Sequence, residues 1–154
     1  MPEARLAGPD DLAFVRDTTL AAYSHYLPVL GAMPGPVHAD HAAAIALGQV
    51  WLVRDGGADA ALMVLEEATD HLMIESLAVL PGHQGRGLGR WMLGFAEDRA
   101  RLAGVPELRL YANVLMTRNI GIYRKAGFVE THRKVVRLPE RVNFVRVYMS
   151  KPLQ

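Results

Sequence analysis

A glycine-rich hexapeptide is the part of this sequence whose residue types and spacing could hold a chemical group. It occupies positions 84–89, after an apolar run at 72–80 that Pro81-Gly82 ends and before a helical pattern that starts at Leu88. The first turn of a helix presents backbone N–H groups without internal partners, and the helix dipole adds partial positive charge there. Because glycine has no Cβ, a bulky anion can approach this backbone closely. The hexapeptide is therefore predicted to bind a phosphate or pyrophosphate.

The spacing of the glycines separates this loop from two known phosphate-binding loops. A nucleotide P-loop has Lys followed by Ser or Thr after its last glycine, whereas Leu88 follows Gly87. A dinucleotide-binding Gly-x-Gly-x-x-Gly pattern that starts at Gly85 requires glycine at position 90, which is Arg90. The sequence thus disfavours a generic nucleotide-binding protein. The pattern that is present is Gln84-x-x-Gly87-x-Gly89.

This pattern, after a strand that ends in Ala-Val-Leu-Pro, resembles the acetyl-CoA pyrophosphate loop of the GNAT superfamily of N-acetyltransferases. A second block, at 108–128, is similar to a later motif of the family, in which a helix that carries Tyr123 ends in Gly127-Phe128. The two blocks stand in the family's order, and the resemblance covers residues 50–150. It implies acetyl-CoA as co-substrate, with pyrophosphate contacts from Gln84, Gly85, Arg86, Gly87, Leu88, Gly89 and Arg90. The alternative for the two arginines is that they are exposed residues at the start of a helix.

The resemblance also implies how the rest of the co-substrate is held. In the family the pantetheine arm pairs with the strand before the loop, which assigns the backbone of Leu77, Ala78 and Val79 to it. The backbone of Val79 is then the oxyanion donor. Asn119 lies one helical turn before Tyr123 on the same face, so it is a further candidate contact for the co-substrate.

Two side chains are candidates for proton transfer. The resemblance assigns the protonation of the leaving thiolate to Tyr123, and a phenol with a pKa of about 10 is protonated at neutral pH and can donate. Glu75 is the single charge in the apolar run 72–80. Burial would raise its pKa toward that of a useful general base for the incoming ammonium. The alternatives are a core-facing tyrosine and a structural carboxylate bonded to the backbone or an arginine.

The acceptor site is expected near the start of the chain. A helical pattern over 9–26 and a second one over 38–47 are separated by a loop at 28–37 that holds three prolines and two glycines. The family builds its acceptor pocket between such helices, and our candidates for lining it are Tyr23, His25, Tyr26 and Met33. The alternative is that the aromatic residues are half-buried on a helix face.

Composition and charge narrow the function classes. The chain has 154 residues, half of them hydrophobic, and no cysteine, which suits one domain over 1–154 and excludes disulfides and a cysteine acyl-enzyme. Residues 1–77 hold three Lys or Arg and eleven Asp or Glu, whereas residues 78–154 hold fourteen and five. This asymmetry fits a polyanionic co-substrate and a cationic acceptor, or simply two solvated faces of opposite sign. Because the basic residues are dispersed, no nucleic-acid partner is expected.

His38 and His41 have a spacing that could place both side chains on one helix face, which makes them candidate metal ligands. No third ligand is evident, so no metal is predicted. The N-terminus carries Glu3 and Arg5 and no long apolar run, so neither a signal peptide nor a membrane span is expected, and the lack of cysteine fits the cytoplasm.

Alternating patterns and turn residues define the elements that position these groups. Strands are expected at 3–7, 49–54, 59–65, 70–80, 108–112, 128–138 and 142–150, with Asp55-Gly56-Gly57 as a hairpin turn. A long helix follows the loop, with an apolar stripe of Leu88, Trp91, Met92, Phe95, Ala96, Leu102 and Ala103. Because this helix connects strands 70–80 and 108–112, those two are expected to be parallel. The fold class is therefore a mixed, mostly antiparallel α/β sheet of about seven strands with flanking helices.

The sequence as a whole predicts an N-acetyltransferase that moves an acetyl group from acetyl-CoA to a primary amine by direct attack. The acceptor is a small cationic molecule or a peptide N-terminus, and the two C-terminal strands are candidates for a homodimer contact. The alternative function is an acyl-CoA-binding sensor without turnover, since the loop 84–89 alone supplies binding.

Overall fold

One mixed sheet organises the described residues, which are 1–31, 35–137 and 143–153 of the computed structural model. Its strand order is β1-β2-β3-β4-β5-β7-β6, and every neighbouring pair is antiparallel except β4 with β5. The predicted fold class and the parallel pair are therefore confirmed. The strands are β1 (Glu3–Leu6), β2 (Val50–Asp55), β3 (Ala58–Glu67), β4 (Leu72–Val79), β5 (Glu107–Asn113), β6 (Val129–Val136) and β7 (Phe144–Pro152).

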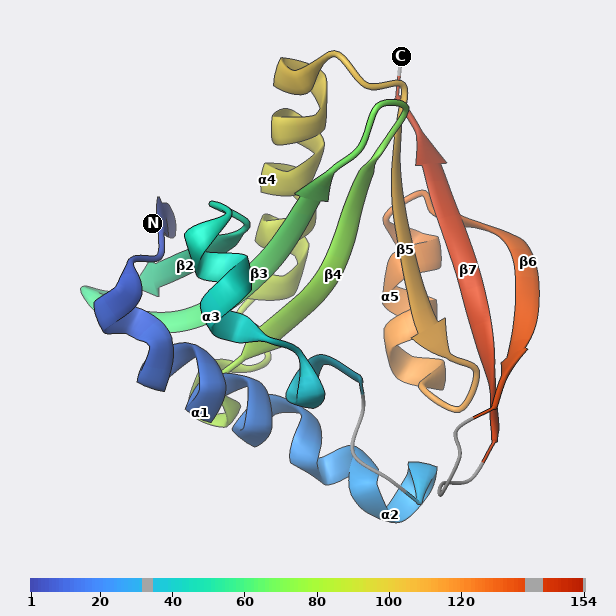
Figure 1. Ribbon diagram of the computed structural model, residues 1–154, viewed down its shortest axis with the longest axis horizontal. Coiled ribbons are helices and arrows are strands. Elements are labelled where there is room, and N and C mark those ends of the chain that lie inside the picture. Colours follow the sequence, from blue (N-terminus) through green and yellow to red (C-terminus); the bar gives the residue numbers. More distant parts are fainter. Residues whose placement is uncertain (32–34, 138–142, 154) are drawn as a thin grey trace.

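Helices cover the two faces of the sheet unequally. On one face lie α1 (Leu12–Tyr23), α2 (Leu27–Leu30) and α3 (His41–Ala46); on the other lie α4 (Leu88–Ala103) and α5 (Thr117–Lys125) (Figure 1). Separate hydrophobic clusters fill the space between the sheet and each layer. In Figure 1, α1 and α3 lie in front of β2 and β3, whereas no described helix lies in front of β7 and β6. Part of the sheet is thus open on the α1 side.

The strands expected from the sequence pair with one another in the structure. The hairpin between β2 and β3 turns at Gly56 and Gly57, whose φ values of 65° and 85° require the left-handed region that glycine reaches without strain. Residues 60–65 in β3 are all buried, as expected for a central strand covered on both faces.

The apolar stripe of α4 differs from the predicted one near its end. The stripe runs through Leu88, Met92, Ala96 and Ala100, four residues apart, and all four are buried. Leu102, which was expected to continue the stripe, is 76% exposed. A four-residue step keeps Ala100 facing the sheet, and Leu102 is then turned by about half a revolution away from it.

The segment after α1 also differs from its prediction. The expected loop at 28–37 begins with one more helical turn, α2, because proline is tolerated in a first turn and Pro28 occupies that position. Gly31 ends it with a φ of 74°. The next helix starts at His41 rather than at 38, since the side chain of Asp40 caps it by accepting a hydrogen bond from the Ala43 N–H at 3.0 Å.

This later start separates the two histidines that were considered as metal ligands. The His41 Nε2 atom lies 3.0 Å from the carbonyl oxygen of Pro36, and His38 belongs to a preceding 3-10 turn, η3 (Gly35–His38). Among the residues that the structure describes, no three His, Cys, Asp or Glu side chains are grouped so that they could hold a metal ion. Within the same ranges, none of the helices combines the length and the apolar character that crossing a bilayer requires.

β4 and β5 are paired over only three positions. Leu72, Met73 and Ile74 pair with Leu108, Arg109 and Leu110, and beyond these positions the two strands separate. A bulge lies at the same level, because Val64 pairs with Ser76 and Leu65 with Ile74, which leaves Glu75 as the extra residue of β4. The sheet therefore opens in its middle, between the end of β4 and the end of β5 (Figure 1).

Candidate active site

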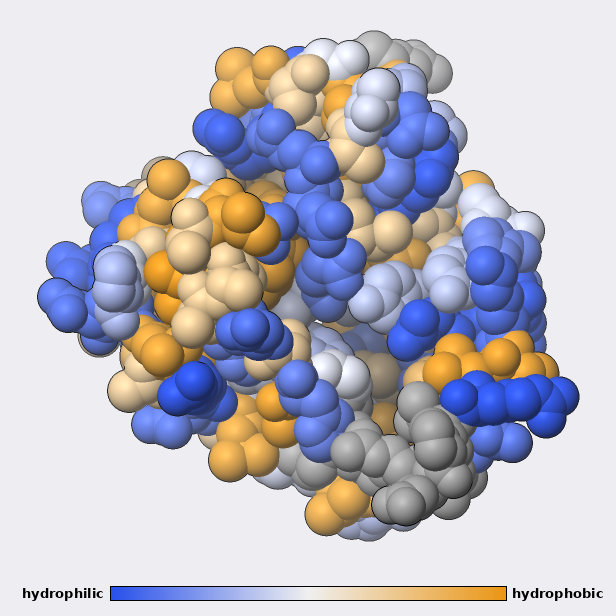
Figure 2. Space-filling model, in the orientation of Figure 1, coloured by the Kyte–Doolittle hydropathy of each residue, from blue (hydrophilic) through white to orange (hydrophobic). Residues whose placement is uncertain are grey.

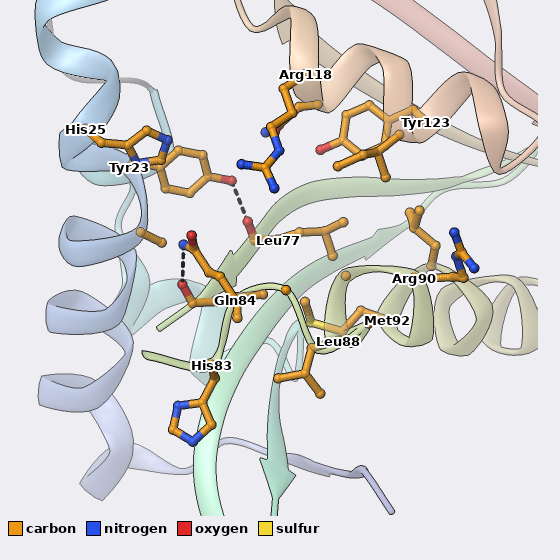
Figure 3. A pocket seen from close by; sticks show the side chains of 18 of the residues that line it. Tyr23, His25, Leu77, His83, Gln84, Leu88, Arg90, Met92, Arg118 and Tyr123 are labelled. Atoms are coloured by element: carbon orange, nitrogen blue, oxygen red, sulfur yellow. Dashed lines mark hydrogen bonds between the residues drawn. The ribbon is translucent and has the colours of Figure 1, made fainter. Parts of the chain in front are cut away.

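The opening between β4 and β5 leads into a cavity of about 450 Å³. Figure 2 shows a hollow at the centre of this face of the molecule, and Figure 3 shows side chains from α1, β4, the glycine loop, α4 and α5 around the pocket. Thirteen of the residues predicted from the sequence line it: Tyr23, His25, Tyr26, Leu77, Val79, Gln84, Gly85, Gly87, Leu88, Gly89, Arg90, Asn119 and Tyr123. The co-substrate residues and the acceptor residues predicted from distant parts of the chain thus meet in one cavity.

The glycine loop has the geometry that close approach of a ligand needs. Gly85 and Gly87 have φ values of 79° and 82°, which any other residue would adopt only with strain. A Cβ atom placed at Gly85, Gly87 or Gly89 would meet nothing within 4 Å, so the space above the loop is open. Gly87 is the N-cap of α4, and its carbonyl accepts the first helical bond, from the Trp91 N–H at 3.0 Å. The free N–H groups of this first turn face the open space.

The edge of β4 that faces the cavity carries two backbone groups of interest. The hydroxyl of Tyr23 donates to the carbonyl of Leu77 at 2.8 Å, and the Gln84 side chain donates to the carbonyl of Val79 at 3.2 Å (Figure 3). In an extended strand the N–H and C=O of one residue point to the same edge, so the N–H groups of Leu77 and Val79 face the cavity too. Ala78 between them pairs with Leu62 of β3, and its side chain is buried in the core.

Tyr123 directs its hydroxyl into the cavity from α5 (Figure 3). Among the described residues, no side chain or backbone group forms a hydrogen bond with this hydroxyl. Burial raises the pKa of Tyr123 well above its ordinary value, and the nearby hydroxyls of Tyr23 and Tyr26 raise it further. The phenol is therefore protonated throughout the neutral range and can act only as a proton donor. Its position is held by the Phe128 N–H, which donates to the Tyr123 carbonyl at 3.0 Å.

The predicted acceptor residues form a small aromatic group beside the cavity. The Tyr26 hydroxyl donates to the Asn119 side chain at 2.9 Å, and the His25 ring centroid lies 4.0 Å from that of Tyr26. Tyr23 is almost fully buried, and its hydroxyl serves the β4 backbone. Met33 lies outside the described residues.

Glu75 lies at the level where β4 and β5 part, and it does not line the cavity itself. Its carboxylate accepts a hydrogen bond from the hydroxyl of Tyr111 in β5 at 2.8 Å. Burial raises the pKa of Glu75, and the neighbouring Glu66 carboxylate adds to the increase. The hydrogen bond from Tyr111 and the charge of Arg146 oppose it only in part. A carboxylate with a raised pKa next to a reaction cavity is a candidate general base.

Sequence reasoning missed several residues of this region. Tyr111 carried no pattern that distinguished it within its strand. The faces of α4 and α5 that point to the cavity contribute further lining residues: Met92, Leu93, Arg118 and Ile122. His83 also lines it, and its Nδ1 atom is buried without a hydrogen-bond partner among the described residues. The one predicted loop residue whose side chain points elsewhere is Arg86, which is exposed and outside the cavity lining.

Comparison with known proteins decides the family. Residues 46–130, more than half of the chain, match the family model of the acetyltransferase (GNAT) domain. The chain belongs to this GNAT acetyltransferase family. The resemblance seen in the loop 84–89 and in the block 108–128 is thereby confirmed.

Two curated acetyltransferases are similar to this chain in sequence. A mycothiol acetyltransferase of Beutenbergia cavernae is 39% identical over 85 residues, which are 51% of this chain and 28% of that protein. A streptothricin acetyltransferase of Streptomyces lavendulae is 40% identical over 57 residues, which are 37% of this chain and 30% of that protein. The chain thus matches less than a third of the length of either relative.

Solved structures extend the likeness to the whole GNAT fold. The ribosomal-protein-S18-alanine N-acetyltransferase of Escherichia coli superposes with a TM-score of 0.77, covering 100% of this chain and 95% of that one. Its sequence identity is 19%, so this similarity concerns the fold. The strand order, the parallel β4–β5 pair and the flanking helices are the features that this fold comparison supports.

Proposed function

We propose that this GNAT protein transfers an acetyl group from acetyl-CoA to a primary amine. The observation that carries the proposal is the cavity lined by α1, the end of β4, the glycine loop and α5, which joins the open loop at the start of α4 to the hydroxyl of Tyr123. A long, polyanionic thioester needs an anion site at one end and proton donors at its reactive end, and this cavity has both.

The residues of the cavity suit the parts of acetyl-CoA in order. The N–H groups at the start of α4 and the side chain of Arg90 suit the pyrophosphate. The cavity-facing backbone of Leu77 and Val79 suits the amide groups of the pantetheine arm, which would add to β4 like a further strand. Asn119, whose side-chain oxygen already accepts from Tyr26, has its amide N–H groups available for the same arm.

Beyond holding the co-substrate, the chemistry requires a base, an oxyanion donor and an acid, and the chain offers a group for each. The neutral amine attacks the acetyl carbon, a C–N bond forms, and the C–S bond breaks as the thiolate of CoA leaves. Glu75 accepts the proton of the incoming ammonium, directly or through water, and the N–H of Val79 donates to the developing oxyanion. Tyr123 supplies the proton that the thiolate takes. The attacking nitrogen loses its second proton to water as the amide forms, and water returns a proton to the phenol.

The names of the relatives point to small molecules and a protein residue as acceptors of those proteins. The curated relatives are named for mycothiol and streptothricin, and the solved neighbour for an alanine of a ribosomal protein. All of these names fit an acceptor that brings an amine to the same cavity.

The test is release of CoA thiol from acetyl-CoA in the presence of a panel of amines, beside a thermal melt with acetyl-CoA, NADH and ATP. A ligand at a hundred times its Kd stabilises a protein by about 2.7 kcal/mol, so binding produces a clear shift. We expect stabilisation by acetyl-CoA and thiol release with at least one amine. Stabilisation without turnover of any amine would favour an acyl-CoA-binding sensor, and no stabilisation would contradict the proposed co-substrate site.

A further inference from the structure

The part of the sheet that no described helix covers on the α1 side carries a group of aromatic and basic side chains. This aromatic–basic patch consists of Tyr111 in β5, Arg146 and Tyr148 in β7, and His132 and Lys134 in β6. Its members share one face by register, since Tyr148 lies opposite both Tyr111 and His132, and Arg146 lies opposite Lys134. Figure 2 shows that hydrophilic side chains predominate over this side of the molecule.

Arg146 is held between rings rather than by a carboxylate. Its guanidinium carbon lies 4.2 Å from the ring centroid of Tyr111, 5.8 Å from that of Phe144 and 6.0 Å from that of Tyr148. No Asp or Glu of the described ranges forms an ion pair with it, and one N–H approaches the Tyr148 hydroxyl at 3.4 Å. A guanidinium stacked on rings is fixed in orientation and presents its remaining N–H donors at the edge, where they match a planar oxyanion.

A second cation lies beside Arg146 in the patch. The Nζ atom of Lys134 is 5.4 Å from the ring centroid of Tyr148, and Lys134 is the register partner of Arg146. Like charges placed directly opposite each other on neighbouring strands repel. A bound anion between them would convert this repulsion into attraction.

The patch has the opposite charge at its other end. The ring of Tyr111 that lies against Arg146 ends in the hydroxyl that donates to Glu75, and Glu66 of β3 lies close to Glu75. The Tyr111 side chain therefore has the Glu75 carboxylate at its hydroxyl and the Arg146 guanidinium over its ring. The negative end lies where β4 and β5 part, two residues before Leu77, the first residue of β4 that lines the cavity.

We infer that the acceptor of this enzyme is an amine that carries a carboxylate, with its ammonium at Glu75 and its carboxylate on the edge of the Arg146 guanidinium. This inference rests on the proposed function and assigns its acceptor class: an amino acid or a molecule with the same dipolar arrangement. It replaces the purely cationic acceptor that the charge asymmetry of the sequence suggested. Arg146 is then the specificity-determining residue, and Lys134 adds to the positive field.

The test compares each common L-amino acid with its C-terminal amide, which keeps the amine and lacks the carboxylate. Acetyl transfer is followed by thiol release, and equilibrium binding of the same compounds is followed by saturation-transfer NMR. For the best acceptor we expect kcat/KM of the acid to exceed that of the amide by about tenfold or more, because a bidentate charge-assisted pair is lost with the amide. In Arg146→Gln this ratio should fall toward one, mainly through KM of the acid.

Two variants separate this role from a structural one. Arg133→Gln is the control, because it makes the same change on the neighbouring strand β6. Arg133 forms an ion pair with Glu130 and lies opposite the core residue Val147, outside the aromatic–basic patch. This variant should leave the acid-to-amide ratio of kcat/KM unchanged. Arg146→Lys keeps the charge without the planar fork and should retain part of the preference. Thermal melts of all three variants report whether the fold is intact.

The outcomes distinguish the acceptor class from the function itself. One outcome is that amino acids bind the wild type but not Arg146→Gln, while the wild type acetylates none of them. This result would support the carboxylate site and contradict the proposed enzyme. Transfer to amides as efficient as transfer to acids, or a ratio unaffected by Arg146→Gln, would overturn the inference and leave the acetyltransferase standing.

Discussion

The Tyr111 hydroxyl donates a hydrogen bond of 2.8 Å to the carboxylate of Glu75 at the position where β4 and β5 separate. This contact joins the two strands just beyond their last residue pair, between Ile74 and Leu110. It also fixes one carboxylate oxygen of Glu75, beside the neighbouring Glu66 carboxylate. The proposed base is thus oriented by a strand that sequence reasoning did not connect with it.

The first prediction concerns the pH dependence of catalysis. If Glu75 accepts the proton of the amine, kcat/KM at low pH should rise as Glu75 ionises, with a midpoint above the ordinary carboxyl pKa of 4.5 because burial raises it. Glu75→Gln should remove this limb and lower kcat by about a hundredfold, with little change in acetyl-CoA affinity. A pH–rate profile of each protein measures both effects.

Glu66 offers a matched control for that profile. The neighbouring Glu66 carboxylate helps to raise the pKa of Glu75, so Glu66→Gln should move the acidic limb to lower pH without abolishing it. If kcat/KM rose with pH in the same way in wild type and in Glu75→Gln, Glu75 would have no part in the mechanism.

The second prediction concerns stability. Because the pKa of Glu75 is raised in the folded state, the folded protein holds this proton more tightly than the unfolded chain. The contribution of Glu75 to the free energy of unfolding is therefore fully present below pH 4.5 and is lost as the pH rises through its folded-state pKa. Denaturant titrations should show Glu75→Gln gaining stability relative to wild type over this interval. If Glu75→Gln instead lost stability relative to wild type as the pH rises, the burial argument would be contradicted.

The third prediction concerns the proton donor. Tyr123→Phe removes a hydroxyl that forms no hydrogen bond within the described residues, so it should slow acetyl transfer by about a hundredfold with little loss of stability. Binding of acetyl-CoA, measured by calorimetry, should persist. Full activity of this variant would exclude Tyr123 as the acid and return it to a packing role against Phe128.

The fourth prediction separates the glycine loop from ordinary helix effects. Gly89 and Gly94 both lie in α4, neither has a positive φ, and a Cβ at either position meets nothing within 4 Å. Replacing either by alanine should therefore stabilise the helix by about 0.5–1 kcal/mol. Only Gly89→Ala should weaken acetyl-CoA binding, because only Gly89 lines the cavity. Equal affinities of the two variants would argue against the phosphate site.

The fifth prediction concerns the bond that fixes α1 to β4. Tyr23→Phe leaves the Leu77 carbonyl without its side-chain donor and should lower the free energy of unfolding by about 1 kcal/mol. Tyr26→Phe removes a hydroxyl from a half-buried site and should cost less. Chemical denaturation of both variants makes the comparison, and a larger loss in Tyr26→Phe would contradict it.

The sequence was most informative where the signal is local. The glycine spacing at 84–89, the hairpin at Asp55-Gly56-Gly57 and the alternating strands are set by residues close together in the chain, and the structure has them as predicted. Leu102 and the start of α3 were misplaced because a helix stripe shifts with each turn and because Asp40 caps the helix late. Both errors are smaller than one helical turn.

The site residues that escaped sequence analysis depend on pairing between distant strands. Tyr111 meets Glu75 only because β4 and β5 pair in one particular register, and Arg146 meets Tyr111 only because β7 inserts beside β5. Neither register is encoded in the spacing of residues within one segment. The contacts of Tyr111 with Glu75 and Arg146 therefore could not be predicted from the sequence, whereas the local glycine pattern of the loop 84–89 could be read from it directly.

The three-position pairing of β4 with β5 has a consequence for hydrogen exchange. The amide of Ala78 faces β3 and is protected by the ladder, but those of Leu77 and Val79 face the cavity and have no strand beside them. In the free protein their protons are exposed to exchange with solvent, although they lie in the middle of a seven-stranded sheet. A ligand that pairs there would complete the ladder, so the substrate itself would supply the missing part of the scaffold.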